Sequence, residues 1–205
     1  MDSISDRPLL EDGRLERYEG STSILVRSDI SPKRRRFTIA HELGHLLLMA
    51  PNSEFVAARH IIGKDVEERF CEDFAGALLL PAWWVKETIH DRPRTLHTLR
   101  VIAGRSNTSL AASCVRMKKI SGWQSTLLCW NRHESNWHFQ WAAGLPNGFE
   151  GRIRSSDHTS AILNSHDMSG DVDIELPLRI SGTEKRVPAQ VSVRHGSAIA
   201  LAVLI

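Results

Sequence analysis

Hydrophobic residues recur at helical spacing early in the chain. Between Ser31 and Pro51, apolar side chains three and four residues apart predict an amphipathic helix that ends near Met49. Ser31 is suited to cap this helix, and Pro32 suits its first position. The apolar stripe of the helix consists of Phe37, Ala40, Leu43, Leu46 and Leu47.

Two further elements are expected around this helix. Short strands at Leu15–Tyr18 and Ser23–Val26 flank a turn at Glu19-Gly20-Ser21, which predicts a hairpin. A second helix is predicted from about Val66 to Leu80, just before Pro81. A period of four indicates that its core face is formed by Val66, Phe70, Phe74 and Leu78.

The pattern changes along the rest of the chain. A short helix containing Trp83-Trp84-Val85 precedes a helix–turn–helix-like pair at residues 95–120, in which Ser109 caps the second helix and Gly122 closes it. After Gly122, alternating or continuous apolar residues predict strands. These strands are expected at 125–131, 137–143, 172–180, around 191–193, and at 197–205, where the last is buried.

Composition narrows the class of protein. Hydrophobic residues make up 41% and charged residues 24%, which is typical of a globular chain, and the net charge of +2 is too small to indicate nucleic-acid or membrane binding. The three cysteines are far apart, which excludes a disulfide framework and an all-cysteine zinc site. We find neither a signal-peptide pattern nor a membrane span, so a cytoplasmic setting is expected.

The strongest chemical signal is the pentapeptide His41-Glu42-Leu43-Gly44-His45 on the first predicted helix. Residues four apart lie on one face of a helix, so both imidazoles can bind one metal ion. Zinc fits best, because two imidazoles and one oxygen ligand leave a position open for water. Glu42, beside His41, is the natural general base for that water.

A third metal ligand is expected from the second predicted helix. This helix carries four acidic residues, Glu67, Glu68, Glu72 and Asp73. Periodicity leaves Glu68 and Glu72 nearly tied, since both lie beside the small residues Cys71 and Ala75. We interpret Cys71 as a packing residue rather than a fourth ligand, because a catalytic site needs an open position.

Two blocks of sequence resemble the ImmA/IrrE family of metallo-endopeptidases. They are RRFTIAHELGHLLL at 35–48 and ERFCEDFAGALLLP at 68–81. The resemblance implies that Glu68, which opens the second block, is the third zinc ligand, together with His41 and His45. Glu72, Gly76 and Leu80 depart from the family pattern without removing a proposed ligand. The hairpin and the helix pair are similar in style alone.

The chemistry implied is zinc-dependent hydrolysis of a peptide bond, with Glu42 moving the proton. A donor to the oxyanion is also expected. The candidates are His60, Tyr18 and His90, and nothing in the sequence chooses among them. For each of them, the simpler interpretation is an ordinary surface or core residue, and we favour it.

Other features have simpler interpretations. The basic run Lys33–Arg36 is most simply a solvated face with local ion pairs. The helix pair at 95–120 offers basic residues for DNA phosphates, but packing on the zinc domain is favoured. Its candidate contacts are Arg100, Arg105, Asn107, Arg116, Lys118 and Lys119. Four tryptophans are expected to build the core of the C-terminal sheet, namely Trp123, Trp130, Trp137 and Trp141.

The sequence therefore predicts an α+β fold, with a zincin-like metallopeptidase domain at 1–122 and a β-rich domain at 123–205. The resemblance implies a substrate that is a regulatory protein, typically a helix–turn–helix repressor, in a stress response or in mobile-element control. Two alternatives stay open: a regulator that binds DNA or a repressor without cleaving it, and the interaction partner in a toxin–antitoxin or phage module.

Overall fold

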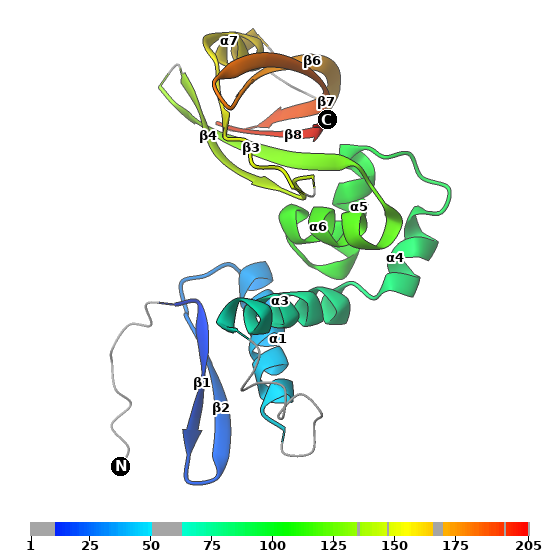
Figure 1. Ribbon diagram of the computed structural model, residues 1–205. Coiled ribbons are helices and arrows are strands. Elements are labelled where there is room, and N and C mark those ends of the chain that lie inside the picture. Colours follow the sequence, from blue (N-terminus) through cyan, green and yellow to red (C-terminus); the bar gives the residue numbers. More distant parts are fainter. Residues whose placement is uncertain are drawn as a thin grey trace. The chain divides into compact units, whose positions relative to one another are not determined.

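The computed structural model describes residues 11–50, 63–134, 136–146, 148–165, 170–194 and 196–204. The chain is α+β, with helices and strands segregated along the sequence (Figure 1). The helices are α1 (Pro32–Leu48), α3 (Lys64–Leu79), α4 (Ala82–Ile89), α5 (Leu96–Ser106), α6 (Leu110–Ser121) and α7 (Asp157–Ser165). The strands are β1 (Gly13–Tyr18), β2 (Ser21–Val26), β3 (Ser125–His133), β4 (Asn136–Ala143), β5 (Ile153–Arg154), β6 (Val172–Ile180), β7 (Thr183–Arg194) and β8 (Ser197–Val203).

The chain forms two compact units. The first comprises Met1–Ala82 with Ser106–Ser109, and the second comprises Trp83–Arg105 with Leu110–Ile205. The change from helices to strands near residue 122 thus falls inside the second unit, and α5 and α6 group with the C-terminal sheet. A domain division at that residue stays a prediction. In the parts of the chain described, no helix is long and apolar enough to cross a membrane.

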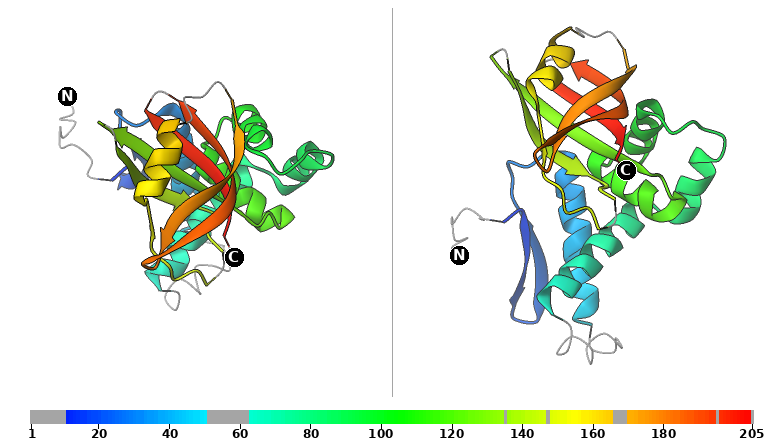
Figure 2. Two further views of the ribbon diagram at one scale, coloured as in Figure 1. Left: turned by 90° about the horizontal axis from the view of Figure 1, so that it is seen from above. Right: turned by 45° about the horizontal axis from the view of Figure 1, so that its top comes forward.

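The hairpin of the first unit forms where the sequence predicted it. β1 and β2 pair antiparallel from Gly13 opposite Val26 to Tyr18 opposite Ser21. Glu19 and Gly20 both have positive φ, 48° and 81°, as the tight two-residue hairpin turn requires. The hairpin runs alongside α1 (Figure 2), which places the start of β1 beside the middle of that helix.

Helix α1 begins and ends as expected. The Ser31 hydroxyl accepts a hydrogen bond from the Arg34 amide at 3.3 Å, and Pro32 occupies the first turn. Ala40 and Leu48 are buried, whereas Leu47, which we assigned to the apolar stripe, is 40% exposed. The buried positions also include Glu42 and Gly44, so the face that carries the motif is turned inward.

Helix α3 packs on α1 through small residues, which corrects its predicted core face. Cys71 and Ala75 are fully buried, whereas Val66 and Leu78 are half exposed. A Cβ atom built on Gly44 would lie 3.0 Å from Cys71 Cα and 3.2 Å from its Sγ. The glycine therefore allows the two helix backbones to approach closely. The face of Glu68, Cys71 and Ala75 looks toward α1, as expected for the metal-binding side.

Substitution of Gly44 by alanine is expected to destabilise the protein by about 1–3 kcal/mol, because the added methyl meets the backbone of α3. Urea unfolding of the variant measures this loss. A matched control is Gly104→Ala in α5, where a Cβ meets nothing within 4 Å. That control is expected to stabilise by about 0.5–1 kcal/mol, since alanine is the better helix former. Equal stability of Gly44→Ala and the wild type would contradict the close approach of the helices.

The second unit is built on a six-stranded sheet in the order β4-β3-β8-β7-β6-β5, in which neighbouring strands are antiparallel. The apolar strand β8 lies between β3 and β7, which confirms that the end of the chain is a buried strand. Helix α7, which the sequence did not reveal, lies across one face of the sheet (Figure 2). Its Leu163 joins Trp130 and Trp137 in the core of this unit.

Three of the four tryptophans expected in the core are buried, and one is not. Trp123, Trp130 and Trp137 are at most 3% exposed, but Trp141 is 41% exposed. The register of β3 with β4 shifts between Cys129 and Trp130, so Gln140 is an extra residue in β4. This bulge reverses the alternation of side chains beyond it. Ala142 rather than Trp141 consequently packs against the core.

The pair α5–α6 packs within the second unit, with α6 against β3 and β4. The favoured expectation, packing of the pair on the zinc domain, stays a prediction. Several basic side chains that we considered for DNA phosphates are engaged inside the unit. Arg100 pairs with Asp171, Lys118 donates to the carbonyls of Gly144 and Leu145, and Arg105 lies 5.6 Å from the centroid of the Trp84 ring.

Candidate metal centre

The two motif histidines converge because they lie one turn apart on α1. Their Nε2 atoms are 3.1 Å apart, and their ring planes meet at 70°. Zinc–nitrogen bonds are about 2.0–2.1 Å long, so two imidazoles at a tetrahedral angle hold their nitrogens about 3.3 Å apart. The spacing of His41 and His45 therefore fits a shared metal ion.

The hydrogen bonding of His45 indicates which ring nitrogen is available. Its Nδ1 lies 3.1 Å from Glu67 Oε1. A carboxylate accepts hydrogen bonds, so this contact favours the His45 tautomer that carries its proton on Nδ1 and leaves the Nε2 lone pair available to a metal. That lone pair points into the space between the two rings, where a cation would be held.

Glu68 brings a carboxylate to the same space from α3. Its Oε2 is 3.3 Å from His41 Nε2, and its Oε1 is 3.8 Å from His45 Nε2. These separations match the edges of a tetrahedron of zinc ligands. Glu72, the other residue of the sequence tie, is exposed and lines the same cleft as the two histidines and Glu68, and no contact with a motif histidine is recorded for it among the described residues. The donor set of two imidazoles and one carboxylate fits zinc, and the assignment of Glu68 stays a prediction.

Cys71 is a further potential donor. Ligand atoms of His41, His45 and Cys71 all lie within 4.8 Å of one another, and Cys71 is fully buried. The same side chain fills the contact with Gly44, as expected for a packing residue. The geometry therefore provides a sulfur atom near the two imidazoles in addition to the carboxylate of Glu68.

Glu42 stands beside this cluster with an unusual environment for a carboxylate. It is 8% exposed. Burial raises its pKa above the usual range, and the charges of His45 and His41 partly offset this shift. A carboxylate with a raised pKa is a better proton acceptor near neutral pH, which suits a general base.

An open cleft of about 500 Å³ gives access to the cluster. Glu42, His41, His45 and Glu68 line it together with residues of the hairpin. A Cβ on Gly13 would clash with the methyl group of Thr38 on α1 and would lie 3.1 Å from the Leu25 carbonyl oxygen. The absence of a side chain at Gly13 therefore lets the hairpin approach α1 closely beside the candidate base.

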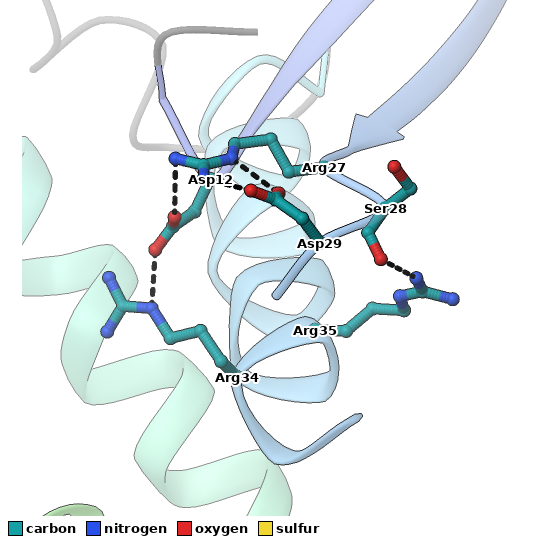
Figure 3. Close-up of polar contacts among 6 residues, drawn as sticks. All are labelled: Asp12, Arg27, Ser28, Asp29, Arg34 and Arg35. Carbon is teal, nitrogen blue, oxygen red and sulfur yellow. Dashed lines mark hydrogen bonds and ion pairs between the residues drawn. The ribbon is translucent and has the colours of Figure 1, made fainter. Parts of the chain in front are cut away.

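A polar network fixes the hairpin to the start of α1 (Figure 3). Arg34 Nε donates to Asp12 at 2.5 Å, and Arg35 donates to the Ser28 carbonyl at 3.2 Å. Arg27 binds Asp29 through two donors, at 2.9 and 2.6 Å. Two arginines of the basic run thus make local contacts with the hairpin, which agrees with the simpler interpretation of that run.

The candidate oxyanion donors do not gather at this site. Tyr18 is 75% exposed at the hairpin turn, and neither it nor His90 lines the cleft. His90 pairs with Asp91 in the second unit. His60 lies outside the described residues.

Sequence reasoning did not assign a role to Gly13 or Gly44, and it considered Glu67 only as a ligand. A glycine inside a helix is a signal of close approach, so Gly44 was open to detection. The contact of Glu67 with the far side of the His45 ring depends on how α3 crosses α1, and the sequence carries no local signal for it.

The remaining two cysteines are not candidates for a nucleophile. Burial raises the pKa of the Cys114 thiol to about 11 and also raises the pKa of Cys129. Both thiols therefore stay protonated near neutral pH, whereas a nucleophilic cysteine needs the thiolate form.

Comparison with known proteins gives the family of the chain. The model of the IrrE N-terminal-like domain, Peptidase_M78, matches residues 7–118. The radiation response metalloprotease IrrE of Deinococcus deserti is 31% identical over 97 residues, which cover 44% of this chain and 34% of that protein. The aligned part thus spans about a third of that relative.

A solved structure gives an independent likeness of fold. A transcriptional regulator of Mycobacterium tuberculosis superposes with a TM-score of 0.50 at 14% identity. The superposition covers 97% of this chain and 64% of that protein. Because the family model matches more than half of the chain, the protein belongs to the ImmA/IrrE family of metallopeptidases.

Proposed function

We propose that this protein is a zinc-dependent endopeptidase. The observation that carries the proposal is the convergence of His41 Nε2, His45 Nε2 and the Glu68 carboxylate beside the buried Glu42, in a cleft open to solvent. Three protein ligands leave one coordination position for water or substrate, which distinguishes a catalytic from a structural zinc site.

Each side chain has a distinct task in the proposed mechanism. When bound, zinc supplies Lewis acidity to the scissile carbonyl and to a coordinated water. His41, His45 and Glu68 would hold the ion. Glu42 accepts a proton from the attacking water and delivers it to the nitrogen of the leaving amine.

The hairpin and the two helices keep these groups in place. Gly44 allows α3 to bring Glu68 close to α1. The Arg34–Asp12 pair holds the start of β1 beside the cleft, where the missing side chain of Gly13 lets the strand pack closely on α1. Preorganised groups of this kind lower the barrier because little rearrangement is needed during the reaction.

The substrate class follows from the family rather than from the cleft. We propose that the substrate is a regulatory protein, of the helix–turn–helix repressor class, in a stress response or in mobile-element control. The name of the Deinococcus deserti relative, a radiation response metalloprotease, supports the first of these roles. The three cysteines are buried and form no disulfide with one another, in keeping with action in the reducing cytoplasm.

Removal of the metal tests this proposal. A chelator is expected to abolish cleavage of a purified repressor by the full-length protein, and added zinc is expected to restore it, because water activation requires the ion. Mass spectrometry of the repressor follows the cleaved bond. Circular dichroism of the metal-free protein is expected to stay native, since Cys71 and Ala75 are buried where α3 packs closely on Gly44 of α1, a contact between side chains and backbone that does not use the ion as a bridge. Cleavage that persists without metal would contradict the proposal.

A further inference from the structure

Two consecutive glutamates of α3 contact opposite sides of one imidazole. Glu68 lies on the Nε2 side of His45, with Oε1 3.8 Å from that atom, whereas Glu67 Oε1 lies 3.1 Å from Nδ1. The side chains of His45 and Glu67 are 16% and 18% exposed, against 43% for Glu68. The Glu67–His45 contact is thus the better shielded of the two.

A carboxylate on Nδ1 has two effects on an imidazole that binds a metal through Nε2. It fixes the tautomer, because Nδ1 must carry a proton to donate a hydrogen bond to the carboxylate. It also orients the ring and strengthens Nε2 as an electron-pair donor. Both effects lower the cost of binding the ion, because the ring is already in its ligating state.

We propose that Glu67 is a positioning residue of the metal centre, which holds His45 in the Nδ1–H tautomer and aims its Nε2 at the ion. The inference rests on the proposed function, since it deepens the account of the same site. It gives the two neighbouring carboxylates different tasks: Glu68 binds the ion, and Glu67 binds the histidine that binds the ion. Because the Glu67–His45 hydrogen bond acts on a ring that binds the ion, its main consequence is for metal binding.

Zinc affinity measured by competition with a chromogenic chelator tests the consequence. Glu67→Ala is expected to weaken binding about 10–100-fold, the usual cost of losing such a partner of a ligating histidine. Glu67→Gln keeps an oxygen that can accept from Nδ1 and is expected to recover most of the affinity. Asp73→Ala is the matched control, because it removes the same charge from an exposed site on the same helix that does not line the cleft. Its affinity is expected to equal that of the wild type.

Nuclear magnetic resonance of the metal-free full chain tests the contact itself. Long-range ¹H–¹⁵N correlations identify the tautomer of each histidine. His45 is expected as the Nδ1–H form in the wild type and in Glu67→Gln, and as a mixture of tautomers in Glu67→Ala. A general loss of structure would affect many resonances, whereas the proposal predicts a change centred on His45.

The two measurements separate this inference from the proposed function. Wild-type affinity in Glu67→Ala, or an unchanged His45 tautomer, would overturn the role of Glu67. A wild-type chain that binds no zinc would contradict the proposed function, while the tautomer measurement would still decide whether Glu67 holds His45.

Discussion

Replacement of Glu42 by glutamine is expected to reduce turnover of a cleavable repressor by about 10²–10⁴-fold while zinc binding is retained. The amide keeps the size of the side chain but accepts no proton, so the loss measures general-base catalysis. The expected loss corresponds to about 3–5 kcal/mol in the activation free energy. Single-turnover kinetics with excess enzyme would measure it, with zinc content determined on the same samples.

The buried position of Glu42 makes this test selective. The side chain is 8% exposed and lines the cleft, and glutamine has nearly the same volume as glutamate, so the variant leaves the packing of the interior almost unchanged. We therefore expect the unfolding midpoint to shift little. Turnover that survives Glu42→Gln at the wild-type rate would exclude this residue as the base. Loss of zinc in the variant would instead assign it to the metal.

Much of the candidate centre was predictable because the information is local. The histidines need no more than an α-helix to come together, and the cap at Ser31 and the stop near Met49 specify that helix. The two-residue turn at Glu19 and Gly20 is equally local. Such features depend on residues a few positions apart, so a single sequence suffices to predict them.

The packing face of α3 could not be predicted from hydrophobicity. The pattern pointed to Val66, Phe70, Phe74 and Leu78 because they are the large apolar residues. The contact with α1 instead uses Cys71 and Ala75, whose small size lets the backbones approach at Gly44. Close packing of small residues buries little side-chain area, and it therefore leaves a weak signal in a hydrophobicity pattern.

The C-terminal unit shows two other limits. Trp141 lies outside the core because β4 contains one extra residue, Gln140, which forms a bulge. The sequence carries no reliable signal for such a bulge. Pro177 interrupts the alternation of β6, where Leu176 and Leu178 are also buried. On the side of β6 that faces away from β7, β5 pairs only with Arg179 and Ile180. The missing amide hydrogen of Pro177 therefore costs no hydrogen bond between strands on that side.

The assignment of Glu68 as the third zinc ligand predicts a large loss of zinc affinity when this residue is replaced. Glu68→Ala is expected to weaken zinc binding by more than about 100-fold, since even the partner of a ligand is worth about 10–100-fold. Cys71→Ala, by contrast, is expected to change zinc affinity by less than about tenfold, because we assign the sulfur to packing against Gly44. The competition assay with a chelator compares the two variants directly.

Cobalt substitution distinguishes the two donors independently of affinity. A thiolate bound to cobalt(II) gives a charge-transfer band in the near ultraviolet, and a carboxylate does not. With His41, His45 and Glu68 as ligands, the wild type is expected to lack that band and to keep an open coordination position. A band that disappears in Cys71→Ala, together with zinc retained in Glu68→Ala, would transfer the third ligand to Cys71. The ion would then bind on the buried side of α1, where the thiol packs, rather than toward the cleft that Glu42 and Glu68 line.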